Sequence, residues 1–314
     1  MPRINRAIDL LERGEVLYYT NPGELTEENG RRQAATWADI LLVDFEHEAF
    51  DVVGLTAFMR GLAAGGPTSD GYRTPTVIAT LPSNCRTVDE VRANAWQARQ
   101  VLTAGVHGIL HTHARSADAV AAFVAETRFA GVGNREPGTG TGPTPESRIA
   151  VPDPRFPPQR GAGGQARSAA IWGVSPVDYM RLADPWPLNS DGELLLGVKI
   201  EDRECLANAC EVAAVPGLAF AEWGPGDMGL SFGYPDAHDP PYPPELERAR
   251  QTVKAACDEA GIAFLSSWND PSQTIEENVR YLLDWGVRIV SPGPEGEEWA
   301  RIGRGIKNRD SGLR

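Results

Sequence analysis

Short apolar runs alternate along this chain with longer segments in which apolar residues recur every three or four positions. Runs of the first kind predict β-strands, and segments of the second kind predict amphipathic helices. The predicted strands are residues 15–20, 39–44, 74–80, 107–111, 193–201, 218–223, 262–267 and 288–292. The predicted helices between them include residues 88–104, 116–127, 203–213, 244–260 and 273–285.

Several predicted strands are continuously apolar rather than alternating, as in ELLLGVKIE at 193–201. Such strands are typical of a parallel sheet that is covered on both faces. Eight strand–helix units in about 300 residues predict an α/β protein with the (β/α)8 TIM-barrel fold. A doubly wound sheet is the alternative. However, NPGELT follows the first strand, in place of the GxGxxG sequence that is typical of dinucleotide-binding folds.

One segment interrupts the alternation of strands and helices. Residues 131–165 are rich in glycine and proline, and we interpret them as an insertion between the fourth strand–helix unit and the fifth strand. Because a long segment of this kind is usually functional or irregular, a mobile lid and a surface excursion both remain open. No other segment marks a domain boundary, so we expect a single barrel domain over residues 1–314.

The composition is that of a globular protein with a strong acidic excess. The formal net charge is −13 and the sequence pI is about 4.9. No helix carries a basic stripe, which argues against a nucleic-acid partner. The N-terminal segment lacks the apolar core of a secretory signal, and no apolar run reaches the ~18 residues of a membrane span. The four cysteines are scattered without metal-ligand spacing, so we expect a cytoplasmic protein without membrane contact.

The chemistry of a (β/α)8 barrel lies at the carboxyl ends of its strands, so residues at these ends are the candidates for a site. Asp44, Glu46 and His47 follow the second strand within four residues. A histidine is the usual general base near neutral pH, and a neighbouring carboxylate selects its tautomer. A solvated acidic loop is the alternative. His111 and His113 end the fourth strand, and we interpret them as structural residues or substrate contacts rather than metal ligands.

The fifth and sixth strands bring further charged residues to their ends. Lys199 and Glu201 lie on one face of the fifth strand, where they need a partner or a metal ion unless they cap the next helix. The sixth strand leads into AEWGPGDMGLSFGYP at 221–235, whose many glycines and prolines predict a loop. Adjacent strands are ~4.8 Å apart, so Glu201 and Asp227 can converge on one Mg²⁺ or Mn²⁺ ion. The loop glycines let backbone N–H groups approach a bound carboxylate.

Four segments, in this order, resemble the HpcH/HpaI family of metal-dependent (class II) pyruvate aldolases: LLVDFEHEAFD, RFPPQRGAGGQARSAAIWG, VKIED and GPGDMGLSFGYP. This family includes 4-hydroxy-2-oxoheptanedioate aldolase and is related to macrophomate synthase. The resemblance runs from about residue 38 to about residue 295, with a gap at the insertion. It implies a (β/α)8 barrel of the phosphoenolpyruvate/pyruvate-enolate type. It also implies a homo-oligomer, a hexamer or trimer of dimers, with exchanged C-terminal helices.

The resemblance further implies an aldolase, a carbon–carbon lyase that forms or cleaves 4-hydroxy-2-oxo acids from a pyruvate enolate and an aldehyde. Glu201 and Asp227 match the ligands of a divalent metal (Mg²⁺, Mn²⁺ or Co²⁺), and His47 matches the base, with Asp44 as its partner. Oxaloacetate decarboxylation and macrophomate synthase-like chemistry, which use the same enolate, are alternatives. The substrate carboxylate is expected at the backbone of Gly224, Pro225, Gly226 and Asp227.

Two positions depart from the family pattern. The family arginine at the end of the third strand is matched here by Ile78, and the residue two before the metal glutamate, commonly glutamine, is Lys199. We hypothesise that Lys199 restores the missing positive charge as a catalytic residue, with Arg86 as a second candidate that binds substrate. Two other hypotheses remain open. Lys199 forms a Schiff base with the 2-oxo acid, or the chain binds a 2-oxo acid without catalysis.

Overall fold

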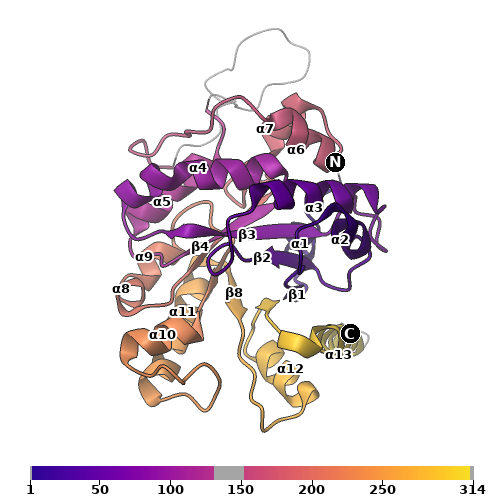
Figure 1. Cartoon of the computed structure of the whole chain (residues 1–314). Coiled ribbons are helices and arrows are strands. Elements are labelled where there is room, and N and C mark those ends of the chain that lie inside the picture. Colours follow the sequence, from indigo (N-terminus) through magenta and orange to yellow (C-terminus); the bar gives the residue numbers. More distant parts are fainter. Residues whose placement is uncertain (1, 131–151, 312–314) are drawn as a thin grey trace.

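The computed structural model describes residues 2–130 and 152–311, and in this part eight parallel strands close into a barrel (Figure 1). Their order is β1-β2-β3-β4-β6-β7-β8-β9, and β9 pairs again with β1. The prediction of a (β/α)8 TIM barrel is confirmed, and each predicted strand overlaps one strand of the ring. These strands are β1 Leu17–Thr20, β2 Ile40–Val43, β3 Thr76–Asn84, β4 Gly108–Thr112, β6 Leu194–Lys199, β7 Phe220–Glu222, β8 Ala263–Ser266 and β9 Ile289–Val290. The short β5 Pro185–Trp186 pairs with the start of β6.

Helices surround the barrel and cover the outer face of its strands (Figure 1). The predicted helices 88–104 and 244–260 coincide with α4 and α11, whereas segment 203–213 is divided at Asn208 into two short helices. None of the helices in the described ranges combines the length and apolar character of a membrane span. The helices are α1 Arg6–Glu12, α2 Glu27–Gln33, α3 Val52–Ala64, α4 Val88–Ala104, α5 Ala117–Thr127, α6 Gln165–Trp172, α7 Pro176–Leu182, α8 Arg203–Ala207, α9 Ala209–Ala213, α10 Pro225–Phe232, α11 Pro244–Ala260, α12 Ile275–Asp284 and α13 Gly296–Ser311, with a 3₁₀ turn η2 Gly293–Glu295.

The strands are buried on both faces, which explains their continuously apolar sequences. Their outward side chains pack against the helices in the larger core cluster. Their inward side chains, such as Leu17, Ile78 and Phe220, form a second cluster inside the barrel. The helix α1 closes the amino-terminal end of the barrel, where Asn5 donates hydrogen bonds to the backbone oxygens of His107 and Glu193. The opposite end, where the strands terminate, remains accessible to a ligand.

The prediction of a loop over residues 221–235 is wrong, because the middle of this segment forms the helix α10. Pro225 occupies the first helical turn, where its missing N–H costs nothing and its fixed φ suits the helix. The helix ends at Gly233, whose φ of 86° favours glycine. A Cβ at Gly229 would lie 2.6 Å from the backbone oxygen of Tyr234. The turn that follows the helix therefore requires a glycine that helix propensity alone disfavours.

Part of the predicted insertion, residues 131–151, lies outside the described residues. The described remainder follows the outer surface of α4 and α5. Arg155 pairs with Asp118 in the first turn of α5, and the backbone N–H of Gln159 donates to the oxygen of Ala125 near its end. Residues 152–164 therefore pack against the helix layer, and none of them lines the cavity described below.

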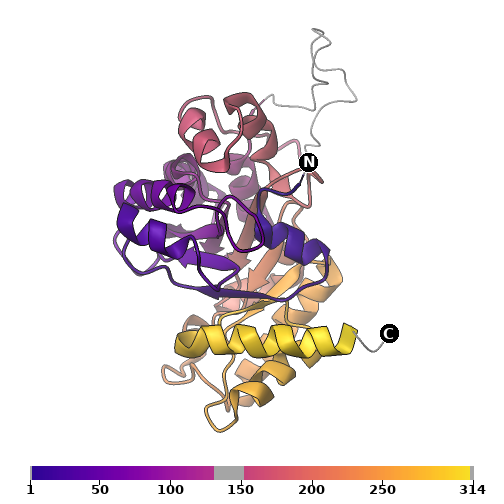
Figure 2. The same cartoon turned by 90° about the vertical axis from the view of Figure 1, so that its right-hand side faces the viewer.

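The C-terminal helix α13 packs on its own barrel beside α12 and β1. Its Trp299 is buried, and the guanidinium of Arg304 pairs with Asp39 at 2.8 Å. Figure 2 shows α13 as a straight helix whose C-terminal end extends beyond the neighbouring elements. Asp39 also pairs with Arg6 of α1 at 2.8 Å and accepts a hydrogen bond from the backbone of Tyr18. One buried carboxylate thus joins both terminal helices to β1.

Replacing Asp39 by alanine is expected to lower the free energy of unfolding by about 3 kcal/mol, because it leaves two arginines without their shared buried partner. Urea unfolding followed by circular dichroism measures this change. Glu27→Ala is the matched control, because Glu27 also pairs with two arginines, Arg31 and Arg60, but does so on the surface. Equal loss of stability in the two variants would contradict the assigned role of Asp39.

Candidate active site and metal centre

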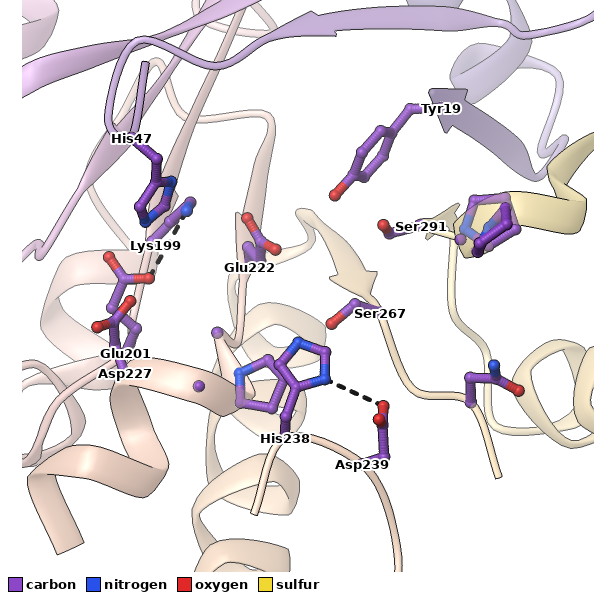
Figure 3. Close-up of a pocket in the computed structure, with 17 residues that line it drawn as sticks. Tyr19, His47, Lys199, Glu201, Glu222, Asp227, His238, Asp239, Ser267 and Ser291 are labelled. Carbon is purple, nitrogen blue, oxygen red and sulfur yellow. Dashed lines mark hydrogen bonds and ion pairs between the residues drawn. The ribbon is translucent and has the colours of Figure 1, made fainter. Parts of the chain in front are cut away.

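A polar cavity of about 510 Å³ lies at the carboxyl ends of the strands (Figure 3). It contains most of the predicted site residues, namely His47, Lys199, Glu201, Gly224, Pro225, Gly226 and Asp227. The other lining residues are Tyr19, Glu222, His238, Asp239, Ser267, Asn269, Ser291, Pro292, Gly293 and Pro294. Residues from seven regions of the sequence therefore meet at one point, as expected for the carboxyl end of a barrel.

His47 and Asp44 form a hydrogen-bonded pair at the end of β2. The Nδ1 atom of His47 lies 2.8 Å from Oδ2 of Asp44, and the histidine side chain is 61% exposed. The other carboxylate oxygen of Asp44 accepts hydrogen bonds from the hydroxyl of Thr80 and the backbone of Glu46. Although burial opposes the shift, hydrogen bonds from His47 and Thr80 lower the pKa of Asp44 below its ordinary value. The anionic Asp44 thus orients the imidazole and leaves Nε2 available to a ligand.

Lys199 lies inside the barrel among three carboxylates. Its Nζ is 2.6 Å from Oε2 of Glu46 and 3.9 Å from Oε2 of Glu201, and β-sheet pairing places it beside Glu222. Burial acts against the charged form, but these carboxylates, with Glu222 contributing most, raise the pKa of Lys199 above its ordinary value. Lys199 is therefore a protonated ammonium group at neutral pH.

Glu201 is the most deeply buried acid of the cavity, with no exposed surface. Its Oε1 accepts a hydrogen bond from the backbone N–H of His113, whereas its Oε2 is buried without a hydrogen-bond partner. Burial raises the pKa of Glu201 to about 8, against the opposing effect of Lys199. A buried carboxylate oxygen without a donor is costly unless a cation binds it.

The carboxylate of Asp227 faces Glu201 from the first turn of α10 (Figure 3). Ligand atoms of Glu46, His113, Glu201 and Asp227 lie within 4.8 Å of one another. Glu46 is engaged by Lys199, and the Nδ1 atom of His113 lies 3.1 Å from Asp202. Glu201 and Asp227 remain as two oxygen donors, which suits a hard divalent cation such as Mg²⁺ or Mn²⁺.

Gly224, which precedes α10, makes room for the Glu201 carboxylate. A Cβ at this position would lie 2.6 Å from Oε2 of Glu201, although the φ of −83° suits any residue. Gly224→Ala is therefore expected to displace the carboxylate and to lower the affinity for Mn²⁺ by about 10- to 100-fold. Titration calorimetry measures the affinity. Gly305→Ala on α13, where a Cβ meets no atom within 4 Å, is the control, and equal affinities of the two variants would contradict the explanation.

The amino end of α10 also exposes backbone donors to the cavity. Gly224 is its N-cap and provides no side-chain hydrogen bond. The hydrogen bonds within the helix begin at Met228, whose backbone N–H donates to the oxygen of Gly224. The N–H groups of Gly226 and Asp227 therefore precede the hydrogen-bonded part of the helix, where an anion is favoured.

The structure does not bring two residues of the sequence hypotheses into the cavity. Arg86 pairs with Glu90 at 3.0 Å in the first turn of α4 and does not line the cavity. Ile78 lies in the apolar cluster inside the barrel, level with Leu42 on β2. The next inward position on β3 is Thr80, which donates to Asp44. Lys199 is thus the one lining ammonium or guanidinium group among the described residues.

Ten lining residues were not predicted to belong to the site, and four of them lie near the ends of barrel strands or directly follow them: Tyr19, Glu222, Ser267 and Ser291. Each lies two positions beyond an inward apolar residue of its strand, for example Glu222 beyond Phe220. This spacing follows from strand alternation, and it is the signal that could have identified them. His113 was interpreted as a structural residue or a substrate contact, and its backbone and ring contact Glu201 and Asp202.

Comparison with known proteins decides the family. The family model described as HpcH/HpaI aldolase/citrate lyase matches residues 31–300 of the chain. The chain belongs to this family. It is 26% identical over 286 residues to the hydroxypyruvate/pyruvate aldolase of Delftia acidovorans, covering 90% of this chain and 84% of the relative. It is 28% identical over 168 residues to the 4-hydroxy-2-oxo-heptane-1,7-dioate aldolase of Escherichia coli, covering 52% and 57%. The prediction of a lyase enzyme is confirmed by this membership.

Two solved structures, one of them from this family, have the same fold. A family member from Burkholderia cenocepacia superimposes with a TM-score of 0.67 at 21% identity, covering 98% of this chain and 99% of that one. Macrophomate synthase superimposes with a TM-score of 0.58 at 18% identity, covering 98% and 89%. At these identities the similarity shows the barrel, and the chemistry has to be argued from the site itself.

Proposed function

We propose that this family member is a divalent-metal-dependent aldolase that forms or cleaves the carbon–carbon bond of 4-hydroxy-2-oxo acids. The observation that carries the proposal is the buried Oε2 of Glu201, which has no hydrogen-bond donor and only the ammonium of Lys199 at 3.9 Å, beside Asp227 in the cavity that His47 also lines. The name of the Delftia acidovorans relative supports pyruvate or hydroxypyruvate as the 2-oxo acid, and the name of the Escherichia coli relative supports a 4-hydroxy-2-oxo acid as the compound that is cleaved. An aldehyde is the second substrate.

Glu201 and Asp227 are the residues that would hold the cation, with Mg²⁺, Mn²⁺ and Co²⁺ as the candidates. A bound divalent cation supplies a Lewis acid that polarises the ketone of the 2-oxo acid. The N–H groups of Gly226 and Asp227, at the amino end of α10, are placed to bind the substrate carboxylate. Together these groups would orient the three-carbon unit toward His47.

His47 is proposed to move the proton. With Nδ1 hydrogen-bonded to Asp44, Nε2 is the atom that accepts a proton, directly or through one water. In the direction of synthesis the proton comes from C3 of the 2-oxo acid. In the direction of cleavage it comes from the 4-hydroxyl group, and the bond between C3 and C4 breaks. Asp44 stabilises the imidazolium form in both directions.

Lys199 is proposed to balance the acidic interior rather than to react. Its ammonium is held by Glu46 at 2.6 Å, and a Schiff base requires a neutral amine. The positive charge offsets Glu46, Glu201 and Glu222, which otherwise repel one another. Lys199 therefore supplies the positive charge near the metal ligands, although a lysine offers no bidentate fork like that of an arginine.

Exchange of the pyruvate methyl protons in D₂O tests the proposed function without any assumption about the aldehyde. We expect exchange with Mn²⁺ or Mg²⁺, no exchange after EDTA, and recovery when the metal is restored. Borohydride added with pyruvate is expected to leave the mass of the chain unchanged. Pyruvate binding without proton exchange would support a non-catalytic binding protein instead. A mass increase at Lys199 would support the Schiff-base mechanism.

We also propose that the protein is a cytoplasmic homo-oligomer. The extended end of α13 and the exposed Val53 and Trp96 support an interface. Light scattering coupled to size-exclusion chromatography measures the mass, and a monomer at micromolar concentration would contradict this part of the proposal.

A further inference from the structure

The cavity extends beyond the proposed metal ligands to a second wall. This distal wall consists of Tyr19, Glu222, Ser267, Asn269 and Ser291. Figure 3 shows the hydroxyl groups of Tyr19, Ser267 and Ser291 and the carboxylate of Glu222 directed toward the same space. The proposed function gives the side chains of Tyr19, Ser267, Asn269 and Ser291 no role, and it uses Glu222 only as one of the carboxylates that Lys199 balances. They lie where the part of a substrate beyond the 2-oxo acid would extend.

Glu222 supplies the strongest requirement on a ligand at this wall. It is 6% exposed, and its Oε2 is buried without a hydrogen-bond partner. A carboxylate accepts hydrogen bonds, so it is satisfied by a donor. A substrate hydroxyl is such a donor, whereas an alkyl group leaves the oxygen unsatisfied and a substrate carboxylate repels it.

The basic side chains that line the cavity are already paired, which weighs against a second acidic group on the substrate. Lys199 faces Glu46 at 2.6 Å, His47 faces Asp44 at 2.8 Å and His238 faces Asp239 at 3.1 Å. Within the described residues, no lining cation is therefore left for a carboxylate at the distal wall. Its serine and tyrosine hydroxyls both donate and accept hydrogen bonds, as the hydroxyl groups of a substrate do.

We propose that the aldehyde substrate is a short, neutral hydroxyaldehyde, with the distal wall as its binding surface. This inference rests on the proposed aldolase function. In the reaction, C3 of the 2-oxo acid loses a proton to His47 and forms a bond to the aldehyde carbon. The aldehyde oxygen takes up a proton and becomes the 4-hydroxyl group, so no oxidant or further reactant is needed. The product is a 4-hydroxy-2-oxo acid with one or more additional hydroxyl groups.

Three aldehydes with the same 2-oxo acid test the inference on the metal-loaded full-length protein. Glyceraldehyde carries hydroxyl groups, propanal has the same number of carbons without them, and succinic semialdehyde carries a carboxylate. We expect kcat/KM for glyceraldehyde to exceed both others by about tenfold or more, the effect of one or two hydrogen bonds. A value for propanal or succinic semialdehyde that equals it would overturn the inference. Pyruvate proton exchange in the same samples separates this outcome from failure of the proposed function.

Variants of the distal wall locate the recognition. Glu222→Gln and Ser291→Ala are each expected to reduce the ratio of kcat/KM for glyceraldehyde over propanal by about three- to tenfold. Thr252→Ala, on the exposed face of α11, is the control and is expected to keep the wild-type ratio. If Glu222→Gln fails to fold, as judged by circular dichroism, Ser291→Ala and Ser267→Ala provide the test. An unchanged ratio in the folded variants would overturn the assignment to this wall.

Discussion

Replacing Glu201 by glutamine is expected to lower kcat/KM for cleavage of a 4-hydroxy-2-oxo acid by at least about 1000-fold. The substitution keeps the shape of the side chain but removes the charge beside Asp227 that would hold a divalent cation. Polarisation of the ketone by such a cation contributes several kcal/mol to the transition state, which corresponds to this factor. Release of pyruvate, coupled to lactate dehydrogenase, measures the rate. Electron paramagnetic resonance of free Mn²⁺ measures binding independently of turnover.

Glu204→Gln is the matched control for this prediction. Glu204 is three residues further along the chain, is 69% exposed and pairs with Arg115 on the surface. The Glu204→Gln substitution removes the same charge from the same region, but Glu204 does not line the cavity. Mn²⁺ binding and turnover are therefore expected to stay near wild type. Tight Mn²⁺ binding by the Glu201→Gln variant would show that the cation is held elsewhere.

Replacing His47 by asparagine is expected to lower kcat for cleavage and the rate of pyruvate proton exchange by about 1000-fold each, because general acid–base catalysis contributes about 10²- to 10⁴-fold. Both reactions are expected to fall together, since the same imidazole moves the proton in each. Binding of Mn²⁺ is expected to persist, because Glu201 and Asp227 are unchanged. Mn²⁺ binding thus distinguishes the two substitutions, because only Glu201→Gln is expected to lower it.

Two further variants test how much Asp44 contributes to catalysis by His47. Asp44→Asn keeps the imidazole but removes the anionic acceptor that orients it, so we expect a smaller loss than in His47→Asn. Glu48→Gln, an exposed residue of the same loop, is the control for a change of local charge. A loss of less than tenfold in His47→Asn would assign the proton transfer to another group.

The residue pairs of the site are brought together by different levels of structure. Asp44 and His47 are close in sequence, so a turn after β2 is enough to join them. Glu201 and Asp227 meet because β6 and β7 are neighbouring parallel strands. Lys199 and Glu46 are 153 positions apart and pair across the barrel. The first two associations follow from local sequence and strand order, and the third requires the closed barrel.

The order of strands and helices could be predicted from the sequence alone. Strands that are buried on both faces carry continuous apolar runs, and this pattern does not depend on the details of packing. The same pattern located the carboxyl ends of the strands, and therefore Asp44, His47, Lys199 and Glu201. Because chemistry in this fold lies at those ends, the position of the site followed from the fold.

The tertiary structure decided what the local pattern could not. The glycines and prolines of residues 221–235 predict a loop, whereas the structure has the helix α10 there, with Pro225 in its first turn. The direction of a side chain depends on strand register, which determined that Glu222 lies at the cavity. Arg86, a candidate substrate-binding residue by sequence, instead pairs with Glu90 on α4. The strands were determined by hydrophobic pattern, which is local, whereas the distal wall and the charge balance depend on which strands meet when the barrel closes.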